Sequence, residues 1–145
     1  MPENTRRGTS PNKVLFVCVH DSGRSKMAEA FFNRYAHGDA IAESAGTEPG
    51  ASMNPIVVAA MKELGFDLST SLPQALTSEM TWGVYMTITM GCLDNTCPVF
   101  MGPKEDWALN DPKGKDLATV RLIRDEIKRL VIALIQHMGI KPEIG

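Results

Sequence analysis

The chain is predicted to be α/β: a single-domain three-layer sandwich with a central four-stranded parallel sheet and helices on both faces. Two observations support this prediction. Strand-like segments alternate with helical patterns along the 145 residues. In addition, the first strand-like segment, 14–19, is apolar at every position, which is typical of a central parallel strand covered on both faces.

Each element follows from a local pattern. Runs of apolar and β-branched residues predict strands at 14–19, 40–45, 85–90 and 107–109. Apolar residues at helical spacing predict helices at 24–36, 55–64 and 117–138, with one further helical turn at 76–80. Asn54 before Pro55 is suited to cap the second helix, and Asp116 the third.

The last helix is expected to be structural. Its apolar residues recur at intervals of three and four, and its other face is charged. Arg121 and Arg129 each lie four residues from Asp125, so both are spaced to form an ion pair with it. We expect this basic face to be solvated and not to be a binding surface.

Composition limits the partners and the compartment of the protein. A formal net charge of -2 gives no reason to expect nucleic acid, and no apolar run approaches the roughly 18 residues of a membrane span. Residues 1–12 lack the apolar core of a signal peptide, so we expect a flexible lead-in before one domain at 13–145. This implies the reducing cytoplasm, where the three cysteines are expected to serve chemistry. A monomer or weak dimer is expected.

The segment from Cys18 to Ser25 carries the clearest chemical signal. Five residues separate Cys18, at the end of a predicted strand, from Arg24, at the start of a predicted helix. A loop of this length can surround a tetrahedral oxyanion with inward N–H groups, supported by the helix dipole. The same field favours the Cys18 thiolate, and Arg24 can bind two oxygens of the anion. The predicted substrate-binding loop therefore comprises Val19, His20, Asp21, Ser22, Gly23 and Arg24.

Two residues of this segment have further expected roles. Ser25 is placed to donate its hydroxyl proton to the Cys18 thiolate and to cap the following helix. His20 is expected to point outward or to pack, and not to act in catalysis. A cysteine six residues before an arginine is a weak motif alone, because a buried and inert cysteine at a strand end is common. The strand before it and the helix after it strengthen the functional interpretation.

Asp111 is the candidate general acid. The loops 18–24, 91–98 and 110–114 follow predicted strands, so a parallel sheet brings them to one edge. There, Asp111 can protonate an oxygen that leaves a bound anion. The alternative is that Asp111 and Pro112 form an ordinary turn.

Cys92 and Cys97 lie in one predicted loop with four residues between them. They can form a disulfide if their Cα atoms approach within about 7 Å. A zinc site is disfavoured because no second ligand pair is present, and two inert cysteines remain an alternative. A redox relay explains them better, because one thiol at an anion site and two in a nearby loop can move two electrons.

These motifs together resemble the arsenate reductases of the low-molecular-weight tyrosine phosphatase fold. The resemblance covers about residues 13–138 and includes Cys18-x5-Arg24-Ser25, Met27-Ala28-Glu29, Ser44-Ala45-Gly46-Thr47, Thr89-Met90-Gly91-Cys92 with Cys97-Pro98, and Asp111-Pro112-x-Gly114. The first and last motifs are shared with the phosphatases. The segment with Cys92 and Cys97 is specific to the reductases.

The resemblance implies a mechanism for reducing arsenate to arsenite. Cys18 attacks arsenate held by Arg24 and the loop, while Asp111 protonates the departing hydroxyl. Cys92 then attacks Cys18 and arsenite leaves, after which Cys97 attacks Cys92. Thioredoxin reduces the resulting disulfide, and no tightly bound cofactor is expected.

The chain departs from the family at two positions near the anion site. Asp21 and Lys26 stand where the family usually has asparagine and glutamine. A carboxylate near the anion would cost about 1–3 kcal/mol at intermediate dielectric. Either a cation such as Lys26 or a metal neutralises Asp21, or the enzyme is slower than its relatives. Some relatives bind potassium here, which by position would involve Asp21, Glu29 and Ser44.

Three alternatives remain open from the sequence. The spacing of Cys92 and Cys97 is short for the thioredoxin-coupled type, and a small thiol such as mycothiol is an alternative donor. A phosphatase would also use Cys18, Arg24 and Asp111, although Lys113 stands where phosphatases commonly carry aromatic residues. A non-catalytic oxyanion-binding module is the third.

Overall fold

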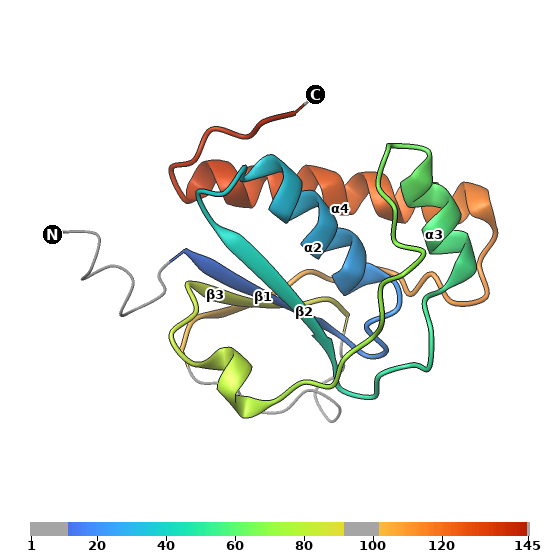
Figure 1. Cartoon of the computed structure of the whole chain (residues 1–145), viewed down its shortest axis with the longest axis horizontal. Helices are drawn as coiled ribbons and strands as arrows, with labels where there is room; N and C mark the ends of the chain where they lie inside the picture. Colours follow the sequence, from blue (N-terminus) through green and yellow to red (C-terminus); the bar gives the residue numbers. More distant parts are fainter. Residues whose placement is uncertain (1–11, 92–101, 145) are drawn as a thin grey trace, which may run out of the picture.

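The computed structural model describes residues 12–91 and 102–144, and these form a parallel four-stranded sheet with the strand order β2-β1-β3-β4 (Figure 1). The strands are β1 (Lys13–Cys18), β2 (Ile41–Gly46), β3 (Met86–Thr89) and β4 (Lys104–Asp106). The helices are α2 (Arg24–Tyr35), α3 (Pro55–Lys62) and α4 (Leu117–His137), with the short 3-10 helix η1 (Ser78–Thr81). The predicted lead-in falls largely in residues 1–11, outside the described residues.

The two faces of the sheet are covered unequally. All three α-helices lie on one face, where α4 packs along α2 and α3 and encloses the main core, as Figure 1 shows. On the other face, Leu15 and Val17 of β1 pack with Leu76, Met80 and Val84 around η1. The α/β architecture and the parallel four-stranded sheet are therefore confirmed, whereas the second covering layer is a loop with one short 3-10 helix.

Strand β1 occupies the centre because its side chains can be buried on both faces. Residues 14–17 have no exposed surface, and β1 pairs with β2 on one side and β3 on the other. The register sets Cys18 beside Gly46, the last residue of β2. Chain order and register thus place Cys18 at the carboxyl edge of the sheet, where ligands bind in folds of this class.

The prediction of the last strand at 107–109 is wrong, because the strand lies three residues earlier in the chain. Strand β4 is Lys104–Asp106, and all three of its residues are exposed at the sheet edge. Trp107 follows it and is buried against Phe16, with ring centroids 5.7 Å apart. Trp107 and Leu109 thus pack into the core instead of pairing in the sheet, and a charged edge strand shows no apolar pattern.

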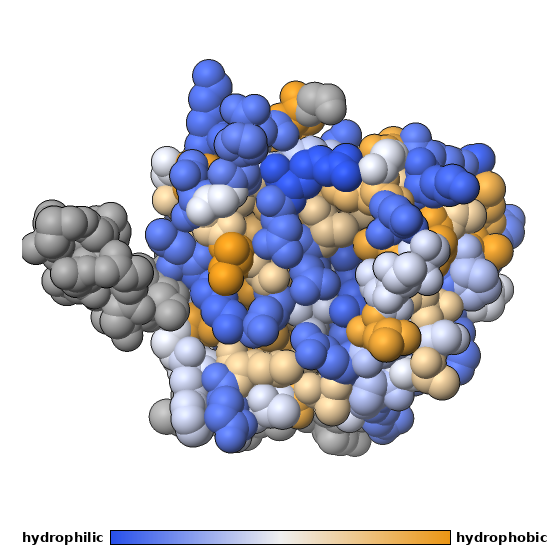
Figure 2. Space-filling model, in the orientation of Figure 1, coloured by the Kyte–Doolittle hydropathy of each residue, from blue (hydrophilic) through white to orange (hydrophobic). Residues whose placement is uncertain are grey.

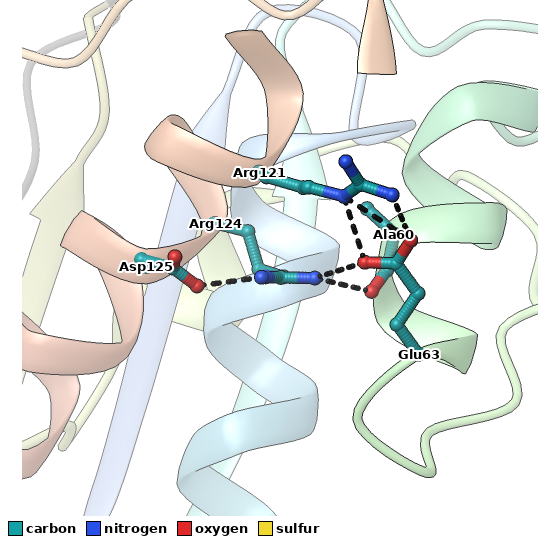
Figure 3. A network of polar contacts seen from close by, with 5 residues as sticks. All are labelled: Ala60, Glu63, Arg121, Arg124 and Asp125. Atoms are coloured by element: carbon teal, nitrogen blue, oxygen red, sulfur yellow. Dashed lines mark hydrogen bonds and ion pairs between the residues drawn. The ribbon is translucent and has the colours of Figure 1, made fainter. Parts of the chain in front are cut away.

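Glu63 joins α3 to α4 through two arginines (Figure 3). The Glu63 carboxylate accepts hydrogen bonds from Arg121 at 2.7–3.2 Å and from Arg124 Nη1 at 2.8 Å. Arg124 also donates to the carbonyl oxygen of Ala60 and to Asp125, at 2.9 and 2.8 Å. The expected pairs of Asp125 with Arg121 and Arg129 do not form, because Arg121 binds Glu63 and Arg129 binds Glu126.

Arg129 completes this correction. It pairs with Glu126, three residues earlier on α4, instead of with Asp125. Arg124 is buried, so the basic side of α4 is not simply a solvated face. Part of it is an interhelical contact that holds the carboxyl end of α3.

Hydrophilic side chains run across the face shown in Figure 2 and separate its apolar spots. The large exposed apolar residues lie on separate segments of the chain, and they are Ile41, Leu72, Trp82, Leu122 and Ile144. Within residues 12–91 and 102–144, no helix is long and apolar enough to cross a membrane.

The Glu63 contacts predict acid sensitivity. Hydrogen bonds from Arg121 and then Arg124 lower the pKa of Glu63 from 4.5 to about 2. A depressed folded-state pKa stabilises the fold above the unfolded value, and this contribution is lost as the pH falls from 4.5 towards 2. We expect Glu63→Gln to lower the urea midpoint at neutral pH and to flatten its fall over that acid range.

Glu126→Gln is the matched control, because Glu126 pairs with Arg129 of its own helix. It should change the urea midpoint less than Glu63→Gln. Equal effects of the two variants would contradict an interhelical role for Glu63.

Candidate active site

The loop from Val19 to Gly23 is held from outside by its carbonyl groups. The carbonyl oxygens of Val19, His20 and Ser22 accept hydrogen bonds from N–H groups of residues 48, 50 and 54, at 2.7–3.1 Å. Among the described residues, no backbone acceptor is found for the N–H groups of the loop. Because the loop's carbonyls are bound from outside and its N–H groups remain available, the loop can bind an anion.

Two local features allow this tight path. Asp21 adopts a φ of 51°, in the left-handed region that aspartate tolerates better than most residues. Gly46 lies behind the loop, where a Cβ atom would come within 2.7 Å of the Val19 carbonyl oxygen. In the sequence, Gly46 appears only as part of a family motif. The reason that this position must lack a side chain is the pairing of β1 with β2, which brings the loop backbone against it.

Cys18 is linked to Asp21 through Ser25. The Ser25 hydroxyl lies 2.9 Å from Cys18 Sγ and donates to Asp21 Oδ1 at 2.6 Å. Ser25 is therefore in contact with Cys18 as predicted, but the structure directs its hydroxyl proton to Asp21 and not to Cys18. The predicted cap is absent, because α2 begins at Arg24 without a side-chain cap. Its first N–H groups are consequently available to an anion.

Asp21 lies behind the loop and does not face the substrate cavity. Its side chain is fully buried, and Oδ2 accepts a hydrogen bond from the N–H of Gln74 at 3.0 Å. Lys26 Nζ lies 3.6 Å from the same oxygen. Of the alternatives for Asp21, neutralisation by Lys26 therefore agrees with the geometry. Gln74 had no recognisable signal in the sequence, since it acts through its backbone.

The residues proposed for potassium do not fit that ion in this structure. Lys26 Nζ also lies 3.7 Å from Glu29 Oε1, so the ammonium contacts both carboxylates. The third residue, Ser44, donates its hydroxyl proton to Glu29 Oε1 at 3.0 Å. Burial raises the pKa of Glu29 above its ordinary value, against the opposing effects of Lys26 and Ser44. A potassium ion here would be repelled by the lysine.

Arg24 connects three loops at the sheet edge. Its Nη1 donates to the carbonyl oxygen of Leu109 at 3.2 Å, and its Nη2 lies 3.7 Å from Asp111 Oδ2. Gly91, at a φ of 80°, leaves room for the guanidinium, because a Cβ atom there would collide with Arg24 Nη1 and the Leu109 oxygen. Among the described residues, the buried Arg24 Nε has no hydrogen-bond partner, as expected for an atom that awaits an anion.

Cys18, Arg24 and Asp111 line one cavity of about 520 Å³. His20, Ser22 and Gly23 also line it, with a wall from residues 50–56 and 112–115. His20 Nδ1 bonds the carbonyl oxygen of Glu48 at 3.0 Å, in agreement with its expected non-catalytic role. The lining described for this cavity contains no Phe, Tyr or Trp.

The Asp111 carboxylate is oriented by its own turn. Oδ1 accepts a hydrogen bond from the N–H of Lys113 at 3.0 Å, while Oδ2 faces Arg24. Pro112 packs so closely on Gly23 that a Cβ atom at Gly23 would lie 2.8 Å from its ring. Asp111 therefore forms an ordinary turn and also lines the cavity, so the turn and a role as general acid are compatible.

Cys92 and Cys97 lie outside the described residues. Their predicted roles therefore remain predictions. Cys92 directly follows Gly91 in the chain, and Gly91 contacts the Arg24 guanidinium. Gly91, the residue before Cys92 in the chain, thus lies beside Arg24 of the anion site.

Gly91→Ala tests the arrangement of Arg24. The added methyl group would displace the guanidinium, so we expect affinity for inorganic phosphate to fall about tenfold or more, measured by calorimetry. Gly139→Ala is the matched control, because Gly139 has a similar φ of 83° and open space around it. Gly139→Ala should lose about 1–3 kcal/mol of stability from its backbone conformation alone, and Gly91→Ala more, because its methyl group also meets the Leu109 oxygen. Equal phosphate affinity in the two variants would contradict the role of Gly91.

Comparison with known proteins agrees with this geometry. A putative arsenate reductase of Halobacterium salinarum is 35% identical over 135 residues, covering 90% of this chain and 95% of the relative. A glutaredoxin arsenate reductase of Synechocystis is 35% identical over 131 residues, covering 88% and 98%. The structure of a thioredoxin-dependent arsenate reductase of Corynebacterium glutamicum has a TM-score of 0.75 at 30% identity, covering 94% of this chain and 71% of that one.

The family profile extends the similarity across the whole fold. The profile described as low molecular weight phosphotyrosine protein phosphatase matches residues 13–143. This range includes β1 through α4 and every site residue discussed above. The chain therefore belongs to the low molecular weight phosphotyrosine protein phosphatase family, and its resemblance to arsenate reductases of that fold is confirmed.

Proposed function

We propose that this protein reduces arsenate to arsenite, with Cys18 as the nucleophile. The proposal is carried by the loop N–H groups and the buried Arg24 Nε, for which residues 12–91 and 102–144 provide no hydrogen-bond partner, in a chain whose relatives are named arsenate reductases. An arsenate oxyanion matches these donors in charge and shape. The part of the lining that the structure describes has no Phe, Tyr or Trp to hold an aryl group, which favours an inorganic oxyanion over an aryl phosphate.

The first step forms a bond between Cys18 sulfur and arsenic. The thiolate attacks, one arsenate oxygen departs, and Asp111 supplies its proton so that water leaves. Arg24 Nε and the loop N–H groups stabilise the remaining oxygens.

The second step moves two electrons to arsenic. A second thiolate, which we assign to Cys92, attacks Cys18 sulfur and forms a disulfide while the sulfur–arsenic bond breaks. Its electron pair stays on arsenic, which leaves as arsenite. Cys97 then attacks Cys92, frees the Cys18 thiolate and leaves a Cys92–Cys97 disulfide for an external dithiol.

A thiol is the electron donor in this scheme, and we propose a thioredoxin-like dithiol. Cys92 directly follows Gly91 in the chain, and Gly91 lies against the Arg24 guanidinium; this supports an internal relay, which presents a protein disulfide to its reductant. A small thiol that attacks Cys18 directly is the alternative. Either route needs a reducing compartment, so we place the protein in the cytoplasm.

A single-turnover reaction tests this function. Reduced protein mixed with arsenate, without external thiol, is expected to release about one arsenite per chain and to end with a Cys92–Cys97 disulfide mapped by mass spectrometry. Cys97→Ser should still release arsenite once but stop at a Cys18–Cys92 disulfide. Arsenite that appears only after a small thiol is added would replace the relay with the alternative donor.

Asp111→Asn tests the acid. The variant keeps the turn but cannot supply the proton, so we expect the rate of arsenite release to fall about 10²–10⁴-fold with little change in phosphate affinity. Turnover of aryl phosphate, with no arsenite formed by the unmodified chain, would instead assign the site to a phosphatase.

A further inference from the structure

A buried row of polar groups extends from Cys18 into the protein interior. Cys18 Sγ contacts the Ser25 hydroxyl, which donates to Asp21, and Asp21 faces Lys26. The Lys26 side chain is only 9% exposed and that of Asp21 is fully buried. An ion pair in such surroundings has a substantial desolvation cost, so its presence behind a nucleophile calls for an explanation.

The row contains one hydroxyl proton and two groups that require it. An ionised Asp21 can only accept, so Ser25 donates to Asp21 while the Cys18 thiol donates to the Ser25 oxygen. Once Cys18 becomes a thiolate, it too can only accept. The Ser25 proton then must turn from Asp21 Oδ1 to Cys18 Sγ, which removes one hydrogen bond from a fully buried carboxylate.

We propose that Lys26 is a positioning residue that compensates Asp21 when the Ser25 proton turns to the Cys18 thiolate. The ammonium lies 3.6 Å from Asp21 Oδ2, whereas Ser25 donates to the other oxygen, Oδ1. Together with the Gln74 N–H, it leaves Asp21 stabilised after Ser25 has turned away. Lys26 thus promotes the reactive form of Cys18 without touching substrate. This role deepens the proposed function and rests on it.

The remaining charges near the row do not replace Lys26. Glu29 shares the ammonium but is itself an acid, so it adds no positive charge. Arg24 and Asp111 face Cys18 from the cavity, where they pair with each other, and His20 is bonded to the carbonyl oxygen of Glu48. Among the described residues, Lys26 is the one cation that contacts Asp21.

The test measures the reactivity of Cys18 directly. In a Cys92→Ser/Cys97→Ser chain, the rate of Cys18 alkylation by iodoacetamide is followed against pH. We expect Lys26→Gln to slow alkylation about tenfold at neutral pH and to move the profile to higher pH, because Asp21 then retains the Ser25 proton. Lys13→Gln, which removes the outer ion pair of Lys13 with Glu43, should leave the profile unchanged.

A double variant separates charge compensation from packing. Asp21→Asn removes the charge that Lys26 balances, so Asp21→Asn/Lys26→Gln should recover most of the lost rate. Urea midpoints identify variants that fail to fold. An unchanged profile for Lys26→Gln, or a double variant as slow as Lys26→Gln, would overturn the proposal.

This readout does not depend on arsenate. If the alkylation rates follow the expected pattern but the unmodified chain forms no arsenite in the single-turnover reaction, the role of Lys26 stands and the reductase assignment fails. If arsenite forms and the alkylation pattern is absent, the reductase assignment stands and the role of Lys26 fails.

Discussion

The placement of Arg24 is the constraint on which the rest of the site depends. Its guanidinium reaches the Leu109 oxygen and Asp111 after β4, and it lies against Gly91 after β3. One cation thereby fixes the relative positions of the anion loop, the acid and Gly91. Its Nε, buried without a partner in the described structure, is the donor that remains for substrate. A lysine could not make these contacts, because it lacks the planar set of donors.

Two groups of contacts hold the segments around Arg24 in place. Backbone N–H groups from residues 48, 50 and 54 bind the loop carbonyls, so the loop is held without using its own N–H groups. One of these, the N–H of Asn54, belongs to the residue that caps α3. The Glu63 network holds the other end of α3 against α4. The wall of the cavity is therefore stabilised by contacts far from the chemistry.

The charges around the nucleophile divide into two sets with different surroundings. Arg24 and Asp111 face the cavity, where an entering anion can separate them. Asp21 and Lys26 lie behind the loop, where no substrate reaches them and their separation would be costly. The Arg24–Asp111 pair therefore responds to substrate, while the Asp21–Lys26 pair keeps the same charges near Cys18 whether or not substrate is bound. Asp21 and Lys26, the two positions at which the sequence was expected to depart from the family pattern, form this second set and contact each other.

The amino-acid sequence by itself determined the parallel α/β class, β1, the three α-helices and the residues of the anion loop. These depend on local periodicity and on short motifs, which adjacent residues encode. Tertiary structure alone decided the position of β4, the partner of Glu63, the need for Gly46 and Gly91, and the buried contact of Lys26 with Asp21. Each of these depends on which surfaces meet across the fold, and burial and backbone approach between distant segments leave no local pattern in the chain.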